Sequence, residues 1–285
     1  MIKYYSVNGA LVPKETAALG VSDLAILRGY GLFDYFLVIS GQPLFFEDYL
    51  DRFWSSAEQL QLEVPVSRKE LARRIFEVIR ANGELNAAIR LVLTGGYAAD
   101  GYTPPGRANL LILEHALPTY PASKYDDGST LMLYEYQRPL PTTKTINYVV
   151  GINLLPQMIA AGAEDLLFHF GGFITETTRA NFFIVKENGT IVTAGEGILE
   201  GVTRKHALHI ARQHYKVEER ALALDELQTA KEAFITSTTK RVMPVVRVGG
   251  TIIGNGKPGE VSRRLFELLR EEEDAYLMNK ESMGV

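Results

Sequence analysis

Two ionisable side chains, Lys144 and Glu176, lie in a stretch whose sequence predicts a strand end before the lysine and a hairpin around the glutamate. Leu131 to Tyr136 has the composition of a strand, and Arg138-Pro139-Leu140-Pro141 cannot continue a sheet ladder because proline has no backbone donor. Lys144 therefore follows a strand end, where side chains reach into clefts. Glu176 lies on the second strand of a hairpin predicted at Gly171-Gly172. Taken alone, such a pair is also what a surface lysine and a solvated strand acid would give.

The residues around this pair belong to ordered motifs that span nearly the whole chain. These motifs are KTIN at Lys144, ITETTRANFF around Glu176, then ILEGVTR and ITSTT. In this order they resemble the fold-type IV pyridoxal-phosphate (PLP) enzymes, which include branched-chain aminotransferases, D-amino-acid transaminases, aminodeoxychorismate lyases and R-selective amine transaminases. The resemblance implies a PLP-dependent class IV transaminase with a mixed α/β fold. It also implies a small N-terminal α/β domain, a larger C-terminal pseudo-barrel, and PLP in the cleft between them.

The resemblance assigns a role to each residue that meets the cofactor. Lys144 would form the Schiff base and then carry the proton of the substrate α carbon. An ordinary lysine, with a pKa of about 10.4, is protonated at neutral pH, so this role requires desolvation or nearby positive charge. Glu176 would face the pyridine nitrogen, and Tyr148 resembles the tyrosine near the ring hydroxyl. The phosphate would be held by an arginine, a helix N-terminus and strand-end hydroxyls, at Arg52, Val202, Thr203, Ser237, Thr238 and Thr239.

Departures from the family pattern concern the substrate and one arginine. Many relatives have glycine or alanine after the acid, whereas Thr177-Thr178-Arg179 follows here, and Arg179 is interpreted as a partner of Glu176, a neighbour of the ring or a surface residue. Gly95 replaces the arginine of well-known bacterial D-amino-acid transaminases. Arg28 and Arg90 instead resemble the two arginines of a smaller group of D-amino-acid transaminases, and two arginines suit dianionic substrates such as glutamate and 2-oxoglutarate.

Three enzyme functions and one non-enzymatic function follow from these residues. The first is transfer of an amino group from a D-amino acid, such as D-alanine or D-glutamate, to a 2-oxo acid. The second is branched-chain L-amino-acid transamination, although in those enzymes a tyrosine corresponds to Ala88 and a tyrosine or phenylalanine to Arg28. The third is an aminodeoxychorismate lyase. A catalytically idle, ligand-binding relative is the fourth, and the presence of both Lys144 and Glu176 argues against it.

Composition restricts the remaining possibilities. A net charge of −4 with scattered basic residues gives no electrostatic basis for binding nucleic acid, and the absence of cysteine excludes disulfides and thiolate chemistry. The start of the chain lacks a signal-peptide pattern, and no apolar run approaches the roughly 20 residues of a membrane span. A cytoplasmic protein is the simplest expectation. No metal motif is present, since helical phase separates the histidines at 206, 209 and 214.

Local patterns also predict how the chain is organised. Residues 1–117 are expected to form the small α/β domain, 118–128 a polar linker, and 129–285 the larger cofactor-binding domain. Helices are expected at 47–62, 67–81, 147–161, 204–214 and 258–278. Hairpins are expected at Asn8-Gly9, Asn188-Gly189 and Gly249-Gly250. The resemblance further implies a homodimer, in which a loop near Arg28 crosses to the neighbouring subunit's active site.

Overall fold

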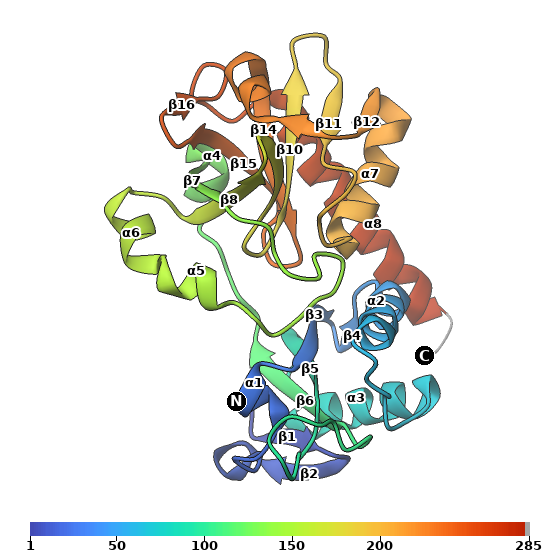
Figure 1. Ribbon diagram of the computed structural model, residues 1–285. Helices are drawn as coiled ribbons and strands as arrows, with labels where there is room; N and C mark the ends of the chain where they lie inside the picture. Colours follow the sequence, from blue (N-terminus) through green and yellow to red (C-terminus); the bar gives the residue numbers. More distant parts are fainter. Residues whose placement is uncertain (283–285) are drawn as a thin grey trace. The chain divides into compact units, whose positions relative to one another are not determined.

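The computed structural model describes residues 1–282, with side chains to residue 279, and the chain divides into two compact units (Figure 1). Unit 1 contains Met1–Pro118, Thr143–Asn147 and the chain from Tyr276, and unit 2 contains Thr119–Thr142 and Tyr148–Ala275. The segment Thr143–Asn147 departs from the division expected from the sequence. It joins unit 1 because the Phe33 N–H donates to the Lys144 carbonyl at 3.0 Å, which adds the segment to the edge of a strand.

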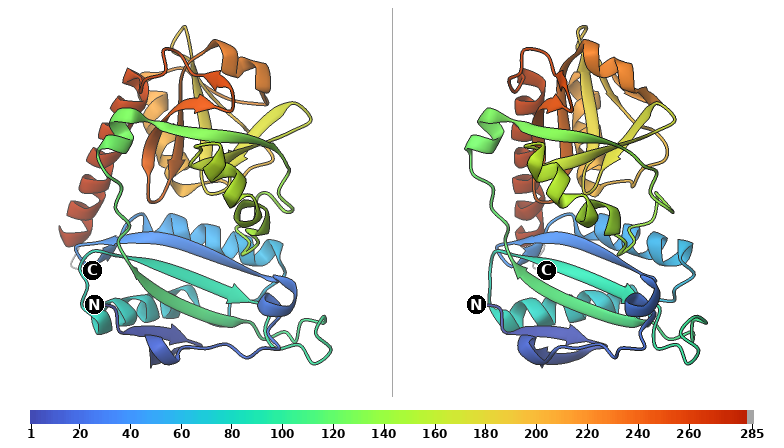
Figure 2. Two further views of the ribbon diagram at one scale, coloured as in Figure 1. Left: turned by 90° about the vertical axis from the view of Figure 1, so that its left-hand side faces the viewer. Right: turned by 60° about the vertical axis from the view of Figure 1, so that its left-hand side comes forward.

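Unit 1 is built on an antiparallel six-stranded sheet in the order β2-β1-β6-β5-β3-β4. Figure 2 shows the long strands β3, β5 and β6 side by side in this sheet. The strands are β1 (Tyr4–Val7), β2 (Ala10–Pro13), β3 (Gly31–Ile39), β4 (Gln42–Pro43), β5 (Ala87–Thr94) and β6 (Asn109–Ala116). The helices of this unit are η1 (Lys14–Thr16), α1 (Leu24–Arg28), α2 (Phe46–Gln59) and α3 (Arg68–Asn82). The predicted helix start at Ser67 is confirmed, because its hydroxyl accepts the Glu70 N–H.

The two faces of this sheet differ in burial. On one face Leu32, Phe36 and Leu91 are fully buried, and Phe36 packs against Tyr49 of α2 with ring centroids 5.5 Å apart. The opposite face presents Phe33, Tyr35 and Arg90, which are only half-buried. Because side chains alternate along a strand, the pairing of Tyr35 with Arg90 places these three residues on one face. This half-buried face of β3 and β5 is called the open face below.

Glu114 of β6 is a buried acid on the helix-covered face. Its Oε2 accepts from Asn82 Nδ2 at 2.9 Å, whereas Oε1 has no hydrogen-bond partner among the described residues. Burial raises the pKa of this carboxyl, and the Asn82 hydrogen bond opposes the rise only in part. The folded protein therefore binds the proton more tightly than the unfolded chain, so stability is lost as the pH rises from about 4.3 through the raised pKa.

Glu114→Gln is accordingly expected to raise the melting temperature at neutral pH. The gain should shrink as the pH approaches 4.3, because the wild-type side chain is then neutral as well. Circular-dichroism melts between pH 4 and pH 8 measure this, with exposed Glu187→Gln as the matched control. A difference between Glu114→Gln and wild type that stays constant with pH would contradict the prediction.

Unit 2 contains a ten-stranded mixed sheet that closes on itself. Strands β10, β14, β15, β7, β8 and β9 are neighbours in that order, and β9 pairs back to β10 through Glu176 and Asn181. The ring of six strands is the pseudo-barrel expected from the sequence. The strands are β7 (Ser129–Glu135), β8 (Asp165–Phe170), β9 (Phe173–Thr177), β10 (Asn181–Lys186), β11 (Ile191–Thr193), β12 (Val217–Glu219), β13 (Leu222–Ala223), β14 (Ala230–Ser237), β15 (Arg241–Val248) and β16 (Thr251–Ile252).

Helices cover this sheet and fill the long connections. The helical segments are α4 (Ser123–Asp127), α5 (Val149–Asn153), α6 (Leu155–Ala160), α7 (Val202–His214), η2 (Leu224–Thr229) and α8 (Glu260–Ser282), of which α8 continues into unit 1. Apolar residues of α7 and α8, including Leu208 and Leu265, pack with the stacked rings of Phe183 and Phe234. Helix α4 forms inside the expected linker. The helix expected at 147–161 is divided at Leu154, and Pro156 lies in the first turn of α6.

Within residues 1–282, every helix is too short or too polar to cross a bilayer. No cluster of three potential metal ligands occurs in the same part of the chain. His206, one of the three helical histidines, instead hydrogen bonds through Nδ1 with Glu272 Oε1 at 2.7 Å.

Candidate active site

Lys144 lies at the edge of the unit 1 sheet, in an extended segment clamped by backbone hydrogen bonds. Its carbonyl accepts from Phe33 N, its own N–H donates to Ser56 Oγ at 3.2 Å, and Ile146 N donates to the Gly31 carbonyl at 3.1 Å. The next residue, Thr145, pairs with Leu32. Because side chains alternate across an extended segment, Lys144 turns to the open face, where its Nζ lies 4.6 Å from the Phe33 ring centroid. The sheet therefore fixes the position of this amine.

Arg90 contacts the same aromatic ring as Lys144. Its guanidinium carbon lies 5.2 Å from the Phe33 centroid and 5.5 Å from that of Tyr35. The two distances to Phe33 limit the separation of Lys144 Nζ and Arg90 Cζ to about 10 Å. Arg90 makes no hydrogen bond or ion pair with any other described residue, and its Nε is buried. The Lys144 amine and the unpaired Arg90 guanidinium thus both lie near the Phe33 ring. This arrangement suits a substrate that carries a carboxylate.

Arg28, the second arginine predicted to bind substrate, occupies a different place. It is exposed in the last turn of α1, and its Nη1 donates to the Leu27 carbonyl at 2.7 Å. Within the described part of the chain Arg28 contacts neither Arg90 nor Lys144. It lies instead beside the β5–β6 loop, where a Cβ on Gly101 would come 3.9 Å from its Nη2.

Arg52 of α2 is oriented by a buried acid that the sequence analysis did not single out. Its Nε and Nη2 donate to the two oxygens of Asp34 at 3.0 and 2.6 Å, and Asp34 is fully buried on β3. The guanidinium also lies 5.2 Å from the Tyr49 ring. A bidentate pair of this kind fixes the plane of the guanidinium. The sequence signal for this acid is its position as the single carboxylate in an aromatic-rich strand, Phe33-Asp34-Tyr35-Phe36.

Glu176 is held at the seam where the barrel of unit 2 closes. Arg138 Nε donates to its Oε1 at 2.7 Å, and the Leu199 N–H donates to its Oε2 at 3.1 Å. Both members of the ion pair are largely buried, with 15% and 7% of their side chains exposed. From the sequence, Arg138 is predicted only to belong to the segment that ends a strand. Arg179 is exposed at the turn after β9, so the arginine that pairs with Glu176 is Arg138.

Two other predicted segments of unit 2, at residues 201–203 and 237–239, lie next to Asn181. Its backbone pairs with Glu176 on one side and Thr236 on the other, which places it next to the strand end carrying Ser237, Thr238 and Thr239. Its amide donates to the Leu199 carbonyl at 2.8 Å. Gly201 packs against the same side chain, and helix α7 starts at the next two residues, Val202 and Thr203.

The N-terminus of α7 offers backbone donors. The first helical hydrogen bond runs from Lys205 N to the Gly201 carbonyl, so the N–H groups before it lack intrahelical acceptors. No side chain of the described residues caps this end, which suits a phosphate. Ser237 Oγ accepts from Lys240 N at 3.3 Å, and Thr239 Oγ1 lies 3.4 Å from the Tyr120 hydroxyl. Tyr148 is the N-cap residue of α5. The chemistry of this donor set fits the phosphate and ring nitrogen of PLP.

Gly201→Ala is expected to weaken cofactor binding about tenfold while the protein stays folded. A Cβ at this position would lie 2.3 Å from Asn181 Oδ1, so the buried Asn181 amide would have to move away from the Leu199 carbonyl. Equilibrium titration with PLP measures the change. Gly250→Ala is the matched control, because a Cβ there meets no atom within 4 Å. Equal affinity of the two variants would contradict the prediction.

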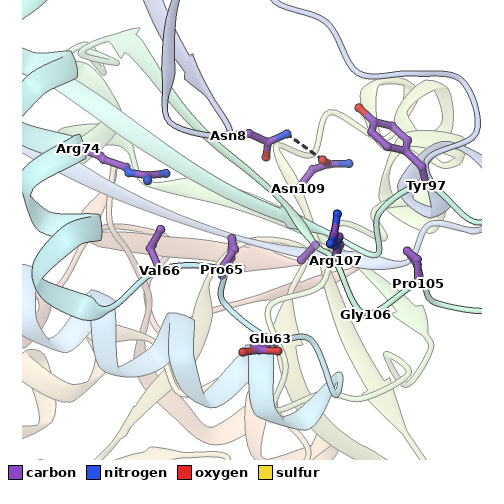
Figure 3. A pocket seen from close by; sticks show the side chains of 11 residues that line it. Asn8, Glu63, Pro65, Val66, Arg74, Tyr97, Pro105, Gly106, Arg107 and Asn109 are labelled. Carbon is purple, nitrogen blue, oxygen red and sulfur yellow. Dashed lines mark hydrogen bonds between the residues drawn. The ribbon is translucent and has the colours of Figure 1, made fainter.

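A hollow of about 560 Å³ lies elsewhere in unit 1 (Figure 3). The β1–β2 turn, the segment after α2, helix α3 and the β5–β6 loop contribute its lining, including Asn8, Glu63, Arg74 and Arg107. Asn8 donates to Asn109 Oδ1 at 2.9 Å in its wall. None of the predicted site residues lines it, so its location gives no support to their roles.

Comparisons with known proteins identify the family of this chain. The family model "Amino-transferase class IV" matches residues 31–248. A "Putative branched-chain-amino-acid aminotransferase" of Methanocaldococcus jannaschii is 30% identical over 93% of this chain and 94% of its own, and a D-alanine aminotransferase of Bacillus licheniformis is 26% identical over 92% and 94%. The T.th. branched-chain amino acid aminotransferase, solved with pyridoxamine 5'-phosphate, superposes with a TM-score of 0.88 at 28% identity, covering 95% and 94% of the two chains. The same enzyme is known with N-(5'-phosphopyridoxyl)-L-glutamate, at a TM-score of 0.85. The chain therefore belongs to the class IV aminotransferases, enzymes of fold type IV that use pyridoxal phosphate.

Proposed function

We propose that this aminotransferase moves an amino group from a D-amino acid, such as D-alanine or D-glutamate, to a 2-oxo acid such as 2-oxoglutarate. The observation that carries the dicarboxylic half of this proposal is the sharing of one ring, Phe33, by the Lys144 amine and the Arg90 guanidinium. The Lys144 amine would act on the α carbon of the substrate. The Arg90 cation, on the same open face, would match a second carboxylate of that substrate. The T.th. relative, in its adduct with L-glutamate, binds a dicarboxylic amino acid of this length.

The residues described above would hold the cofactor in the following way. The backbone donors at Val202 and Thr203, with Ser237, Thr238 and Thr239, would bind the phosphate together with Arg52. Glu176 would face the ring nitrogen, its charge balanced by Arg138, and Tyr148 would lie near the ring hydroxyl. Bound PLP supplies an aldehyde that accepts the amino group and a ring that takes up electrons from the α carbon. Lys144 would then move the proton of that carbon.

The preference for D-amino acids rests on Arg28 and Arg90. Branched-chain enzymes have a tyrosine where this chain has Ala88 and a tyrosine or phenylalanine where it has Arg28, and Ala88 is fully buried on the open face beside Arg90. The Arg90 guanidinium makes this part of the open face less suited to a branched apolar side chain than to a carboxylate.

A branched-chain L-amino-acid aminotransferase is the second candidate. The similarity to the M. jannaschii and T.th. proteins favours it, and so do the rings of Phe33 and Tyr35, which offer apolar surface beside Lys144. Both candidates use the same cofactor, so the substrate distinguishes them.

Parallel half-reactions decide between the two. PLP-loaded enzyme is mixed with D-alanine, D-glutamate or L-leucine, and conversion to the amine form is followed by the visible spectrum. We expect turnover of the D-amino acids with 2-oxoglutarate as acceptor. Turnover of L-leucine alone would reject the proposal in favour of the second candidate, and product formation from aminodeoxychorismate without an acceptor would identify a lyase.

We further propose a homodimer in which Arg28 acts in the partner's active site. Helices α5 and α6 expose the apolar side chains of Val149, Ile152 and Ile159 to 64–69%, which suits contact with a second copy. The side chain of Arg28 is exposed, which is consistent with a role across the dimer.

Mixing two impaired variants tests the crossing of Arg28. Arg28→Ala and Lys144→Ala dimers are combined and allowed to exchange subunits. If Arg28 acts across the dimer, each mixed dimer has one intact site, and activity should recover to about a quarter of wild type at random exchange. Recovery should be absent if Arg28 acts within its own chain. Different affinity tags on the two variants show, by their co-purification, that exchange has occurred.

A further inference from the structure

His115 of β6 lies on the open face, one strand beyond Arg90. It pairs with Ala88 of β5, which places it diagonally opposite Arg90 on the same face. Tyr35 of β3 is near both residues, with its ring centroid 5.5 Å from the Arg90 guanidinium carbon and 6.4 Å from the His115 ring. The Tyr5 ring lies 6.3 Å from the His115 ring. Lys144, Phe33, Arg90, Tyr35 and His115 therefore form one connected group of side chains on this face.

Arg90 and His115 each have a buried nitrogen, Nε and Nε2 respectively, that has no hydrogen-bond partner within the described residues. A buried polar atom without a partner is energetically costly, so native proteins retain few of them. Two such atoms on adjacent strands, both available as donors, are the complement of an anion with several acceptor oxygens.

The charges around His115 keep its ring neutral in the free protein. Burial lowers the pKa of the imidazole below its ordinary value, and the positive charges of Arg90 and Lys14 lower it further. Lys14 comes from η1 and Arg90 from β5, whereas β1 and β3 present the phenols of Tyr5 and Tyr35. No carboxylate contributes to this shift. A bound anion would be the missing negative charge and would favour the protonated ring.

We propose that His115 and Arg90 together form a carboxylate pocket that receives the distal carboxylate of a dicarboxylic substrate. His115 Nε2 donates to one oxygen and the guanidinium to the other, so His115 determines specificity without touching the reacting atoms. The proposal deepens the proposed function and rests on it, because Lys144 sets the position of the α carbon. The separation of Lys144 Nζ and Arg90 Cζ is at most about 10 Å, which is compatible with a five-carbon diacid.

The pocket predicts a pH-dependent affinity with a defined sign. The free ring is neutral at pH 7 and the occupied ring is stabilised as the cation, so binding takes up a proton. Affinity for a diacid should therefore rise as the pH falls from 8 to 6. A monocarboxylate that does not reach the pocket should lack this dependence.

Calorimetric titration of the PLP-loaded enzyme with glutarate, and with pentanoate as the monocarboxylate, tests the pocket. His115→Phe should weaken glutarate about tenfold at pH 6.5 and leave pentanoate unchanged. His115→Gln, which retains a donor but does not titrate, should recover part of the affinity and abolish its pH dependence. His209→Phe is the matched control, because His209 is exposed on α7. The imidazole resonance that disappears in His115→Phe should move toward the protonated position when glutarate binds to wild type.

Failure of this inference is distinguishable from failure of the proposed function. If Arg90→Met weakens glutarate and His115→Phe does not, the substrate proposal stands and the role of His115 is rejected. If neither variant alters glutarate binding, both the pocket and the dicarboxylic substrate are rejected. An unshifted His115 resonance at saturating glutarate would also overturn the inference.

Discussion

Lys144→Ala is expected to lower kcat by at least about 10³-fold and to abolish covalent trapping of the cofactor by borohydride. The physical reason is positional. The Lys144 backbone is fixed by hydrogen bonds to Phe33 and Ser56, and its amine lies over the Phe33 ring. No backbone movement can bring another amine to this point without breaking the edge of the sheet. PLP should still bind, because the phosphate donors belong to other elements.

Borohydride reduction followed by peptide mapping measures the adduct directly. Wild type should carry the modified peptide at residue 144, and Lys144→Ala should carry none. Lys144→Arg tests whether positive charge alone is sufficient for activity, since it retains a cation over Phe33 but offers no nucleophile at neutral pH. Lys231→Ala is the matched control, because this lysine is exposed on β14. Normal turnover by Lys144→Ala, or an adduct at another lysine, would reject the catalytic role.

Features determined by local sequence were predicted well. The turn at Asn8-Gly9 has both residues at positive φ, as the hairpin between β1 and β2 requires. The capped helix at Arg68–Asn82 begins after Ser67 and ends at Gly83, as composition and spacing indicated. These signals act over a few residues, so one sequence is enough to detect them.

Features determined by distant contacts were missed. The closure of the barrel depends on pairing between Glu176 and Asn181, and the partner of Glu176 is Arg138, 38 positions earlier. Arg52 obtains its geometry from Asp34, 18 positions earlier on another element. Arg138, Asp34 and Asn181 carry no distinguishing mark in their own segments. Periodicity shows which face of an element is buried, but it does not show which side chains two elements bring together.

Breaking the buried ion pair at the barrel seam should separate stability from catalysis. Arg138→Leu leaves the Glu176 carboxylate buried with its charge uncompensated by the guanidinium, and the expected cost is about 3–5 kcal/mol of unfolding free energy. Glu176→Gln should lower kcat about 10²–10³-fold, because the charge proposed to face the cofactor's ring nitrogen is removed. Both groups belong to unit 2, so the stability effect should appear in that unit.

The double variant Arg138→Leu/Glu176→Gln is the decisive measurement. It contains no unpaired charge, and glutamine can still accept from the Leu199 N–H, so most of the stability lost in Arg138→Leu should return. Activity should remain as low as in Glu176→Gln, since no rearrangement of the seam restores the carboxylate. Urea unfolding followed by circular dichroism is suitable, because the single tryptophan, Trp54, lies in unit 1 and does not report on unit 2. Recovery of both properties would mean that Glu176 serves only to hold the barrel closed.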